Sequence, residues 1–426
     1  MARRNREKKW EKLDNTAKIF PVIASDELTN TYRISFVLNE TIDPALLQEA
    51  LDIVLPKIPG FNLRLRSGIF WYYLEENGKK APRVFEENAY PCRYIHASKN
   101  NSYLFRVTYY KCRINLEVFH VLTDGMGGIT FLRELVYQYL RLAHPDLRDR
   151  LGDGLSEETS LDRDDSFVRY YKKSAKNNYK SQRAFLIKGE KLPYKGFGVV
   201  HAYMSVEELK KVSKKYGISI NEYLVACFIY STYRAYQGKV TANKPIRVAV
   251  PVNLRPFFDS MTTKNFFVMV SAEFIPEKDD YTFEEIAKIT ADSLRAQINK
   301  DNLEEIFSYN VSNETLFIAR AVPLPLKNIA MRFVYTRAAL ANTTTITNIG
   351  NITVGDDYRD YIKGIHCFIA FSKGQELKGT IVSFKDTLCY SFASAFSDTS
   401  VQKGIFRQIA SDGAKVEIET NGVFYE

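Results

Sequence analysis

The chain has 426 residues, of which 45% are hydrophobic, so it can bury a sizeable core and is not intrinsically disordered. Its formal net charge of +9 is a modest positive excess, which suits an anionic ligand such as a nucleotide. No apolar run approaches the ~20 residues that a membrane-spanning helix needs, which excludes an integral membrane protein.

The chain begins with a basic arm, residues 1–12, whose net charge is +4. No apolar segment follows this arm, so it is not a secretory signal. The arm is either solvated and without a partner, or makes a weak contact with a membrane surface. The five cysteines are widely spaced, odd in number and without CxxC spacing. They predict reduced thiols in a cytoplasmic protein.

Strands and helices alternate in the first third of the chain. Asp43 is a suitable N-cap ahead of Pro44, so a helix is predicted over residues 43–55. The strands predicted from alternating polarity are residues 31–38, 61–66, 70–74, 103–110 and 113–120. Four of these form two hairpins, the first around Ser67 and Gly68. Such a mixture favours an α+β fold over a doubly wound sheet.

The composition changes over residues 144–195. Residues 152–165 are acidic and rich in turn formers, and residues 167–183 are basic and aromatic. Interleaved basic and aromatic residues can bind nucleic acid, but no recognisable module accompanies them. We therefore interpret the segment as a solvated crossover between two halves, and we predict no nucleic-acid partner.

The second half repeats the mixture of helices and strands. Ser205 and Glu208 have the spacing of a capping box at the start of a helix that Gly217 ends. A second, apolar helix is predicted over residues 222–236. The predicted strands are residues 246–251, 345–348, 365–371, 378–384 and 387–392. The domains are predicted as an N-terminal lobe (13–150), a crossover linker (151–195) and a C-terminal lobe (196–426).

The end of the strand over residues 113–120 carries the strongest functional signal. Ile114, Leu116 and Val118 alternate with polar residues, and His120 falls in register with Val118 on the apolar face. A turn follows that contains an aspartate and three glycines: Asp124, Gly125, Gly127 and Gly128. An inward-facing histidine at a strand end, beside such a turn, is a candidate general base.

This stretch also resembles a known signature. Phe119 to Gly128 is similar to the HxxxDG motif of the chloramphenicol acetyltransferase-like acyltransferases, which include plant BAHD enzymes and peptide-synthetase condensation domains. Residues 253–258 and 262–267 are similar to the LRP…GN(F) segment of bacterial alcohol acetyltransferase-type members. Residues 347–350 resemble the SNLG strand of the same group. The resemblance covers roughly residues 13–400.

The resemblance implies a fold and a place for the site. It implies an α+β protein of two α/β sandwich lobes, with the active-site channel between them. It also implies that His120 is the catalytic base, and that Asp124 holds the turn through a salt bridge to an arginine. Our first candidate for that arginine is Arg64, with Arg66 and Arg33 behind it, because Arg64 lies on a cationic strand face.

The remaining site residues follow from the turn and the second motif. Gly125 is expected to allow close approach of substrate or a positive φ, whereas Gly127 either lines the channel or serves helix-start geometry. The resemblance implies that Arg255 supports the channel wall and that Asn265 packs where the halves meet. Asn265 could also serve as an oxyanion donor, and Asn348 is a weaker channel-lining candidate.

No metal site is predicted, because the five histidines lack metal-ligand spacing and no HExxH motif occurs. No GxSxG elbow occurs either, which agrees with direct attack by an acceptor and no covalent acyl-enzyme. The site therefore needs no bound cofactor, and acyl-CoA enters as co-substrate.

The resemblance implies transfer of an acetyl or short acyl group from acyl-CoA to the hydroxyl of a small molecule or lipid, with His120 as base. One alternative is a carrier-protein-dependent condensation enzyme. The other is a non-catalytic binding protein on this scaffold. Condensation domains usually carry a second histidine where this chain has Phe119, which favours the O-acyltransferase. Acyl length, acceptor and oligomeric state do not follow from the sequence.

Overall fold

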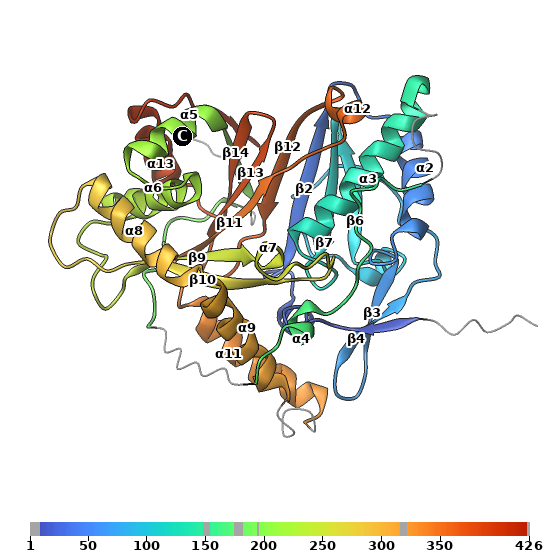
Figure 1. The fold of residues 1–426 in the computed structure, drawn as a ribbon, viewed down its shortest axis with the longest axis horizontal. Coiled ribbons are helices and arrows are strands. Elements are labelled where there is room, and N and C mark those ends of the chain that lie inside the picture. The colour runs from blue at the N-terminus through green and yellow to red at the C-terminus, as the bar shows by residue number, and fades with distance from the viewer. Residues whose placement is uncertain (1–8, 148–153, 174–181, 194–195, 316–321, 424–426) are drawn as a thin grey trace, which may run out of the picture.

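Two lobes lie side by side in the computed structural model of this chain, each built on a β-sheet with helices on one face (Figure 1). The structure describes residues 9–147, 154–173, 182–193, 196–315 and 322–423. The predicted α+β class with two sheet-bearing lobes is confirmed.

The N-terminal lobe has a five-stranded sheet in which alternate side chains enter the core. Its order is β12 (Ile362–Ile369), β2 (Thr31–Leu38), β7 (Arg113–Phe119), β6 (Phe105–Tyr110) and β5 (Phe85–Glu86). Helices α2 (Pro44–Val54) and α3 (Gly125–Ala143) pack on one face. Ile34, Ile114 and Leu116 are fully buried beneath them, as the alternation in the sequence predicted. The Asp43 cap is also confirmed, because its carboxylate accepts from the backbone N–H groups of Ala45 and Leu46.

A small three-stranded sheet joins the start of the chain to this lobe. Its order is β1 (Trp10–Lys12), β4 (Tyr72–Glu76) and β3 (Leu63–Ser67). Residues 10–12 are therefore not frayed, since β1 pairs antiparallel with β4, although Trp10 is exposed to solvent. Whether the arm contacts a membrane surface stays a prediction. Residues 1–8 lie outside the described residues.

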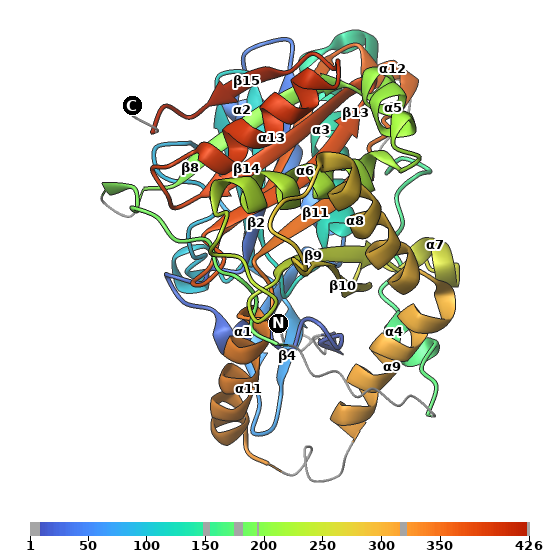
Figure 2. The same ribbon diagram turned by 90° about the vertical axis from the view of Figure 1, so that its left-hand side faces the viewer.

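The C-terminal lobe has a seven-stranded sheet. Its order is β10 (Phe267–Phe274), β9 (Ile246–Asn253), β11 (Thr344–Asn351), β13 (Leu377–Phe384), β14 (Thr387–Ser394), β8 (Gly198–Ser205) and β15 (Glu417–Thr420). The helices over one face are α5 (Val206–Lys215), α6 (Ile220–Ala235), α8 (Phe283–Gln297) and α13 (Ser400–Ser411), as Figure 2 shows. Ser205 caps α5 by accepting from the Glu208 N–H. The Glu208 side chain accepts instead from the Lys415 N–H, so the predicted capping box is only half formed.

Shorter helices and two longer ones complete the described fold. They are α1 (Phe20–Ile23), η1 (Leu55–Lys57), η2 (Ala97–Lys99), η3 (Pro145–Leu147), α4 (Ser166–Arg169), α7 (Arg255–Phe258), α9 (Lys300–Thr315), α11 (Leu324–Ala339) and α12 (Asp356–Arg359). Phe167 of the predicted linker is buried in the core of the C-terminal lobe, so this part of the segment is not a solvated connection. The exact domain boundaries stay a prediction.

The second half of the sequence contributes one strand to the N-terminal sheet. β12 comes from the second half of the sequence, yet it pairs antiparallel with β2 along the edge of the N-terminal sheet, with Ile362 opposite Leu38 and Ile369 opposite Tyr32. β12 also packs against β13 and β14 of the other sheet. Strand β12 therefore connects the two lobes, because it pairs within one sheet and packs against the other.

Within the described ranges, none of the helices combines the length and the apolar character required to cross a bilayer.

Candidate active site

His120 lies one residue beyond β7, at the junction of the two lobes. Its backbone N–H donates to the Asn30 carbonyl at 2.9 Å, which ends the strand one residue before the predicted limit. Three aromatic rings enclose the imidazole. Phe20 stacks on it with ring centroids 4.6 Å apart, and Tyr32 (5.1 Å) and Phe267 (5.7 Å) lie at its sides. The rings fix the histidine while leaving one edge open to a cavity.

That cavity measures about 340 Å³ and is lined by residues of both lobes. The N-terminal part contributes His120, Asp124 and Gly125, and the C-terminal half contributes Arg255 and Asn348. A site at the junction of two domains is where ligand cavities are most common. The structure thus brings together these five residues that the sequence singled out.

A buried hydrogen-bond chain fixes the orientation and the tautomer of His120. The Asn265 side-chain amide donates to Asp14 Oδ2 at 2.9 Å, so its Oδ1 faces His120 Nδ1 at 3.0 Å. An amide oxygen can only accept, so Nδ1 carries the proton and Nε2 keeps its lone pair. Asn265 therefore orients the imidazole, and one of its two amide N–H groups is directed to Asp14, so the oxyanion role of Asn265 stays a prediction.

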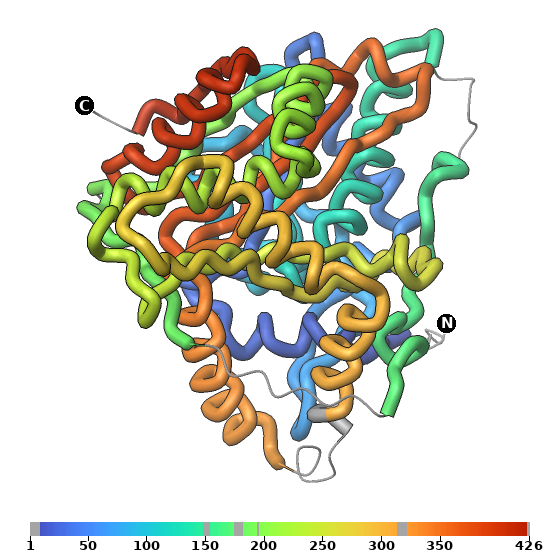
Figure 3. Tube along the Cα trace, turned by 60° about the vertical axis from the view of Figure 1, so that its left-hand side comes forward, coloured from blue at the N-terminus to red at the C-terminus, as the bar shows by residue number. Residues whose placement is uncertain are grey.

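Asp14 is the functional residue that sequence reasoning missed. It is 3% exposed and accepts from the backbone N–H groups of Ala17 (2.7 Å) and Asn265 (3.2 Å), besides the Asn265 amide. Figure 3 shows the blue N-terminal segment passing below β9 and β10, where these contacts form. The only signal in the sequence was local. An aspartate three residues before Ala17 fits a turn cap and says nothing of a partner 251 residues away.

Burial sets the ionisation of this chain of residues. Burial lowers the pKa of the His120 imidazole below its usual value, and the opposing charge of Asp124 offsets that only in part. The imidazole is therefore neutral at pH 7, as a general base must be. Burial also raises the pKa of the Asp14 carboxyl to about 6, so this group is mainly ionised at pH 7 and able to accept three hydrogen bonds.

Asp124 does pair with an arginine, but the predicted partner was wrong. Arg255 Nη1 lies 2.8 Å from Asp124 Oδ2 and Nη2 lies 3.1 Å from Oδ1, a bidentate pair. Arg64 pairs instead with Glu75 on the neighbouring strand β4. Strand polarity located a cationic face correctly, but Glu75 lies directly opposite Arg64 and neutralises it, whereas Arg255 reaches Asp124 from the other lobe.

The guanidinium of Arg255 uses all five of its N–H donors. Besides the two bonds to Asp124, it donates to the carbonyls of Thr262 (2.8 Å) and Lys264 (2.7 Å) and to Asn253 Oδ1 (3.1 Å). Asp124 also accepts from the backbone N–H groups of Gly127 and Phe266. The two similarity motifs are thus one structural unit that spans the lobes.

The glycines after Asp124 serve close packing and not unusual backbone angles. Gly125 lines the cavity and does not take a positive φ. A Cβ on Gly127 would lie 1.9 Å from Thr123 Oγ1 and 2.7 Å from the Thr263 carbonyl. Gly127 is therefore packed at the lobe junction, and the alternative that it lines the channel is not supported. Asn348 does line the cavity, where its side chain bonds to Asn221 and to the Gly350 N–H.

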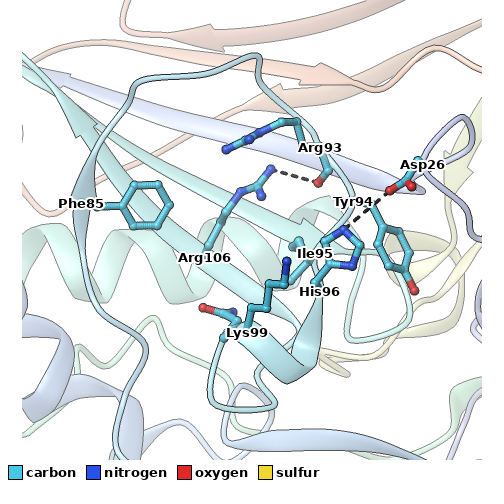
Figure 4. Close-up of a pocket in the computed structure, with 9 residues that line it drawn as sticks. Asp26, Phe85, Arg93, Tyr94, Ile95, His96, Lys99 and Arg106 are labelled. Atoms are coloured by element: carbon cyan, nitrogen blue, oxygen red, sulfur yellow. Dashed lines mark hydrogen bonds and ion pairs between the residues drawn. The ribbon is translucent and has the colours of Figure 1, made fainter.

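A larger cavity of about 580 Å³ lies beside β5 and β6 of the N-terminal lobe (Figure 4). Its one histidine, His96, is half exposed and lies 3.6 Å from Asp26, and Arg106 donates to the Arg93 carbonyl. This cavity lacks an enclosed base with a free lone pair, so we place the chemistry in the smaller cavity at His120. Among the described residues, no group of three or more histidine, cysteine, aspartate or glutamate side chains is placed to hold a metal ion.

Solved structures with the same fold extend along almost the whole chain. The Fusarium sporotrichioides protein TRI101, solved with coenzyme A and T-2, matches with a TM-score of 0.61 at 15% identity, over 95% of this chain and 99% of that one. Polyketide synthase associated protein 5 from Mycobacterium tuberculosis matches with 0.59 at 14% identity, over 94% and 97%. Trichothecene 15-O-acetyltransferase from F. sporotrichioides matches with 0.59 at 12%, over 95% and 94%.

The chain has the two-lobed fold of the chloramphenicol acetyltransferase-like and condensation-domain acyltransferases. No family model matches the sequence, and no curated protein does. Identities of 12–15% show the fold alone, so the activity rests on the site itself.

Asp124→Asn should lower the melting temperature and the activity together. It removes a buried carboxylate and leaves the half-buried Arg255 guanidinium beside a neutral group, and breaking a buried pair costs up to about 3–5 kcal/mol. Differential scanning calorimetry measures the change. Arg64→Met is the matched control and should cost less than about 1 kcal/mol, as loss of a partly exposed pair does. Equal losses in the two variants would contradict the central place of the Asp124–Arg255 pair.

Asn265→Ala should lower kcat by about ten- to a hundredfold, less than loss of the base itself, because the ring loses its orienting acceptor. Asp14→Asn should act in the same direction, since an amide oxygen replaces the carboxylate that accepts three bonds. Steady-state kinetics with Asn243→Ala, an exposed asparagine outside the cavity, as the control would check this. Wild-type kcat in Asn265→Ala would show that the imidazole needs no positioning by this residue.

Proposed function

We propose that this protein transfers an acyl group from acyl-CoA to a hydroxyl acceptor by direct attack, with His120 as general base. The observation that carries the proposal is the neutral imidazole of His120, whose ring lines a cavity between the lobes. Its Nδ1–H is held by Asn265, and no described residue bonds to its Nε2. The fold is that of acyltransferases, including TRI101 solved with coenzyme A.

A hydroxyl is a poor nucleophile at pH 7, and a base within ~3 Å of it can take its proton as the oxygen attacks the thioester carbonyl. In our proposal His120 Nε2 takes that proton. The tetrahedral intermediate then collapses, the C–S bond breaks, and the imidazolium returns the proton to the departing thiolate. Asn265 stays bonded to Nδ1–H throughout, so the ring does not rotate between the two transfers.

Direct attack is favoured over a covalent acyl-enzyme by the lining of the cavity. Among the described residues that line it there is neither serine nor cysteine. Cys367 and Cys389 are buried elsewhere, and burial raises the pKa of both thiols, which keeps them protonated. The lining does contain Thr347 and Lys378, but the hydrogen bond that the structure gives the His120 ring goes to Asn265 and to neither of them, which favours a single displacement.

The His120→Ala variant should lose at least about 10²-fold in kcat, as removal of a general base does, while its melting temperature changes little. Release of coenzyme A from acetyl-CoA in the presence of a primary alcohol measures the rate. His144→Ala, which removes a histidine paired with Glu40 outside the cavity, is the control. Full activity of His120→Ala would rule out this mechanism and favour a non-catalytic role.

With acetyl-CoA and a neutral primary alcohol, the pH profile of kcat/KM should be level near pH 7 and fall only on the acid side. Because burial lowers the pKa of His120, the imidazole is protonated, and unable to act as base, only below its usual titration range. The Asp14 carboxyl, with a pKa of about 6, contributes a second step to the acid limb. Asp14→Asn should remove that step. A profile that keeps rising through pH 8 would contradict a neutral histidine base.

A further inference from the structure

A single lysine enters the active-site cavity from the floor of the C-terminal sheet. Along β13, Leu377 and Ile381 point into the core of the C-terminal lobe. Lys378 lies on the opposite face, as does Val382, which packs in the N-terminal core. Lys378 lines the cavity that also holds His120. The strand register therefore places an ammonium group where the two lobes meet.

This ammonium has no partner within the part of the chain that the structure describes. The Lys378 side chain is half buried, yet it forms no hydrogen bond or ion pair with the described residues. The neighbouring carboxylate of Glu376 lies 3.5 Å from Lys191 instead. Among the described residues that line the cavity, Asp124 is the only acid, and Arg255 together with two backbone N–H groups already occupies its oxygens.

A half-buried charge without a partner is unfavourable, so the position calls for an explanation. Burial lowers the pKa of Lys378 to about 8, which still leaves the group mainly protonated at pH 7. Burial is the main cause that lowers the pKa of His120, and the charge of Asp124 opposes it. The positive charge of Lys378 makes a smaller contribution that also lowers this pKa. Lys378 and His120 line the same cavity, so one bound substrate can contact both.

A second free donor lies on the adjacent strand. The Thr347 hydroxyl of β11 lines the same cavity and makes no hydrogen bond to other described residues. β11 pairs directly with β13, with Thr347 opposite Thr380, two residues from Lys378. Much of the surrounding lining is apolar: Pro251, Phe267, Met269, Ile349, Ile369 and Ala370. The Lys378 ammonium, the Thr347 hydroxyl on the adjacent strand and the apolar wall fit a group with a single negative charge.

We propose that Lys378 and Thr347 form a subsite for a carboxylate carried by one of the two substrates. The inference rests on the proposed function, because it assigns the substrate class of the same cavity. The carboxylate comes either from a dicarboxylic acyl group on the donor or from a hydroxy acid as acceptor. The bond-making step is unchanged: the ester C–O bond forms and the thioester C–S bond breaks.

The test compares substrates that differ only in this charge. Succinyl-CoA and butyryl-CoA form the donor pair, and 6-hydroxyhexanoate and its methyl ester form the acceptor pair. Each is titrated calorimetrically into the full-length protein without the second substrate, and kcat and KM are then measured with it. The variants are Lys378→Met, Lys378→Arg and, as a control that loses an exposed charge, Lys403→Met. Melting temperatures confirm that each variant is folded.

We expect wild type and Lys403→Met to bind the carboxylate member of one pair more tightly than its neutral partner. Lys378→Met should weaken that binding by roughly ten- to a hundredfold, the size of a hydrogen bond to a charged group, and leave the neutral partner unchanged. Lys378→Arg should restore most of the preference. The pair that responds tells whether the carboxylate belongs to the acyl group or to the acceptor.

Two results would overturn the subsite. One is equal binding of both members of each pair by the wild type. The other is an equal loss of kcat/KM on all substrates in Lys378→Met, which would assign the lysine to the transition state. A Lys378-dependent preference in calorimetry without transfer from any donor would support the subsite and refute the acyltransferase. Acyl transfer without a preference for the carboxylate substrates would support the acyltransferase and refute the subsite.

Discussion

The bidentate pair between Asp124 and Arg255 is the interaction on which the site depends. Asp124 starts α3 in one lobe, and Arg255 starts α7 in the other. The guanidinium also holds the carbonyls of Thr262 and Lys264, so it fixes the loop that presents Asn265. A buried charge cannot be left unpaired cheaply, and this makes the two lobes dock in one register. The geometry at His120 follows from that register.

Three elements far apart in the sequence set the protonation of the base. β7 supplies the ring, the loop before β10 supplies Asn265, and the N-terminal segment supplies Asp14. Each member of this chain fixes the hydrogen-bonding sense of the next, because a carboxylate accepts and an amide does both. Enclosure by Phe20 and Tyr32 removes water from the ring and lowers its pKa. Position and ionisation of the base thus have one structural origin.

The sequence predicted local structure well and long-range partners poorly. β2 lies over the predicted residues 31–38, and the strand ending near His120 was predicted to within one residue, because side-chain alternation is a local property. The resemblance placed Arg255 and Asn265 near the site. It did not show that Arg255 is the partner of Asp124. Arg64 was preferred because strand periodicity cannot show that Glu75 on the neighbouring strand already neutralises it. Asp14 was missed because its role comes from a contact across the fold.

Strand β12, which the second half contributes to the N-terminal sheet, also constrains how the chain folds during synthesis. Until residue 369 has left the ribosome, β2 has an open edge on which β12 will later pair. An open edge offers unpaired N–H and C=O groups to other chains and is a site of aggregation. The N-terminal lobe is therefore complete only after most of the second half has been translated. A fragment that ends before β12 would leave this edge of β2 unpaired, so the N-terminal lobe cannot complete its sheet without the second half of the chain.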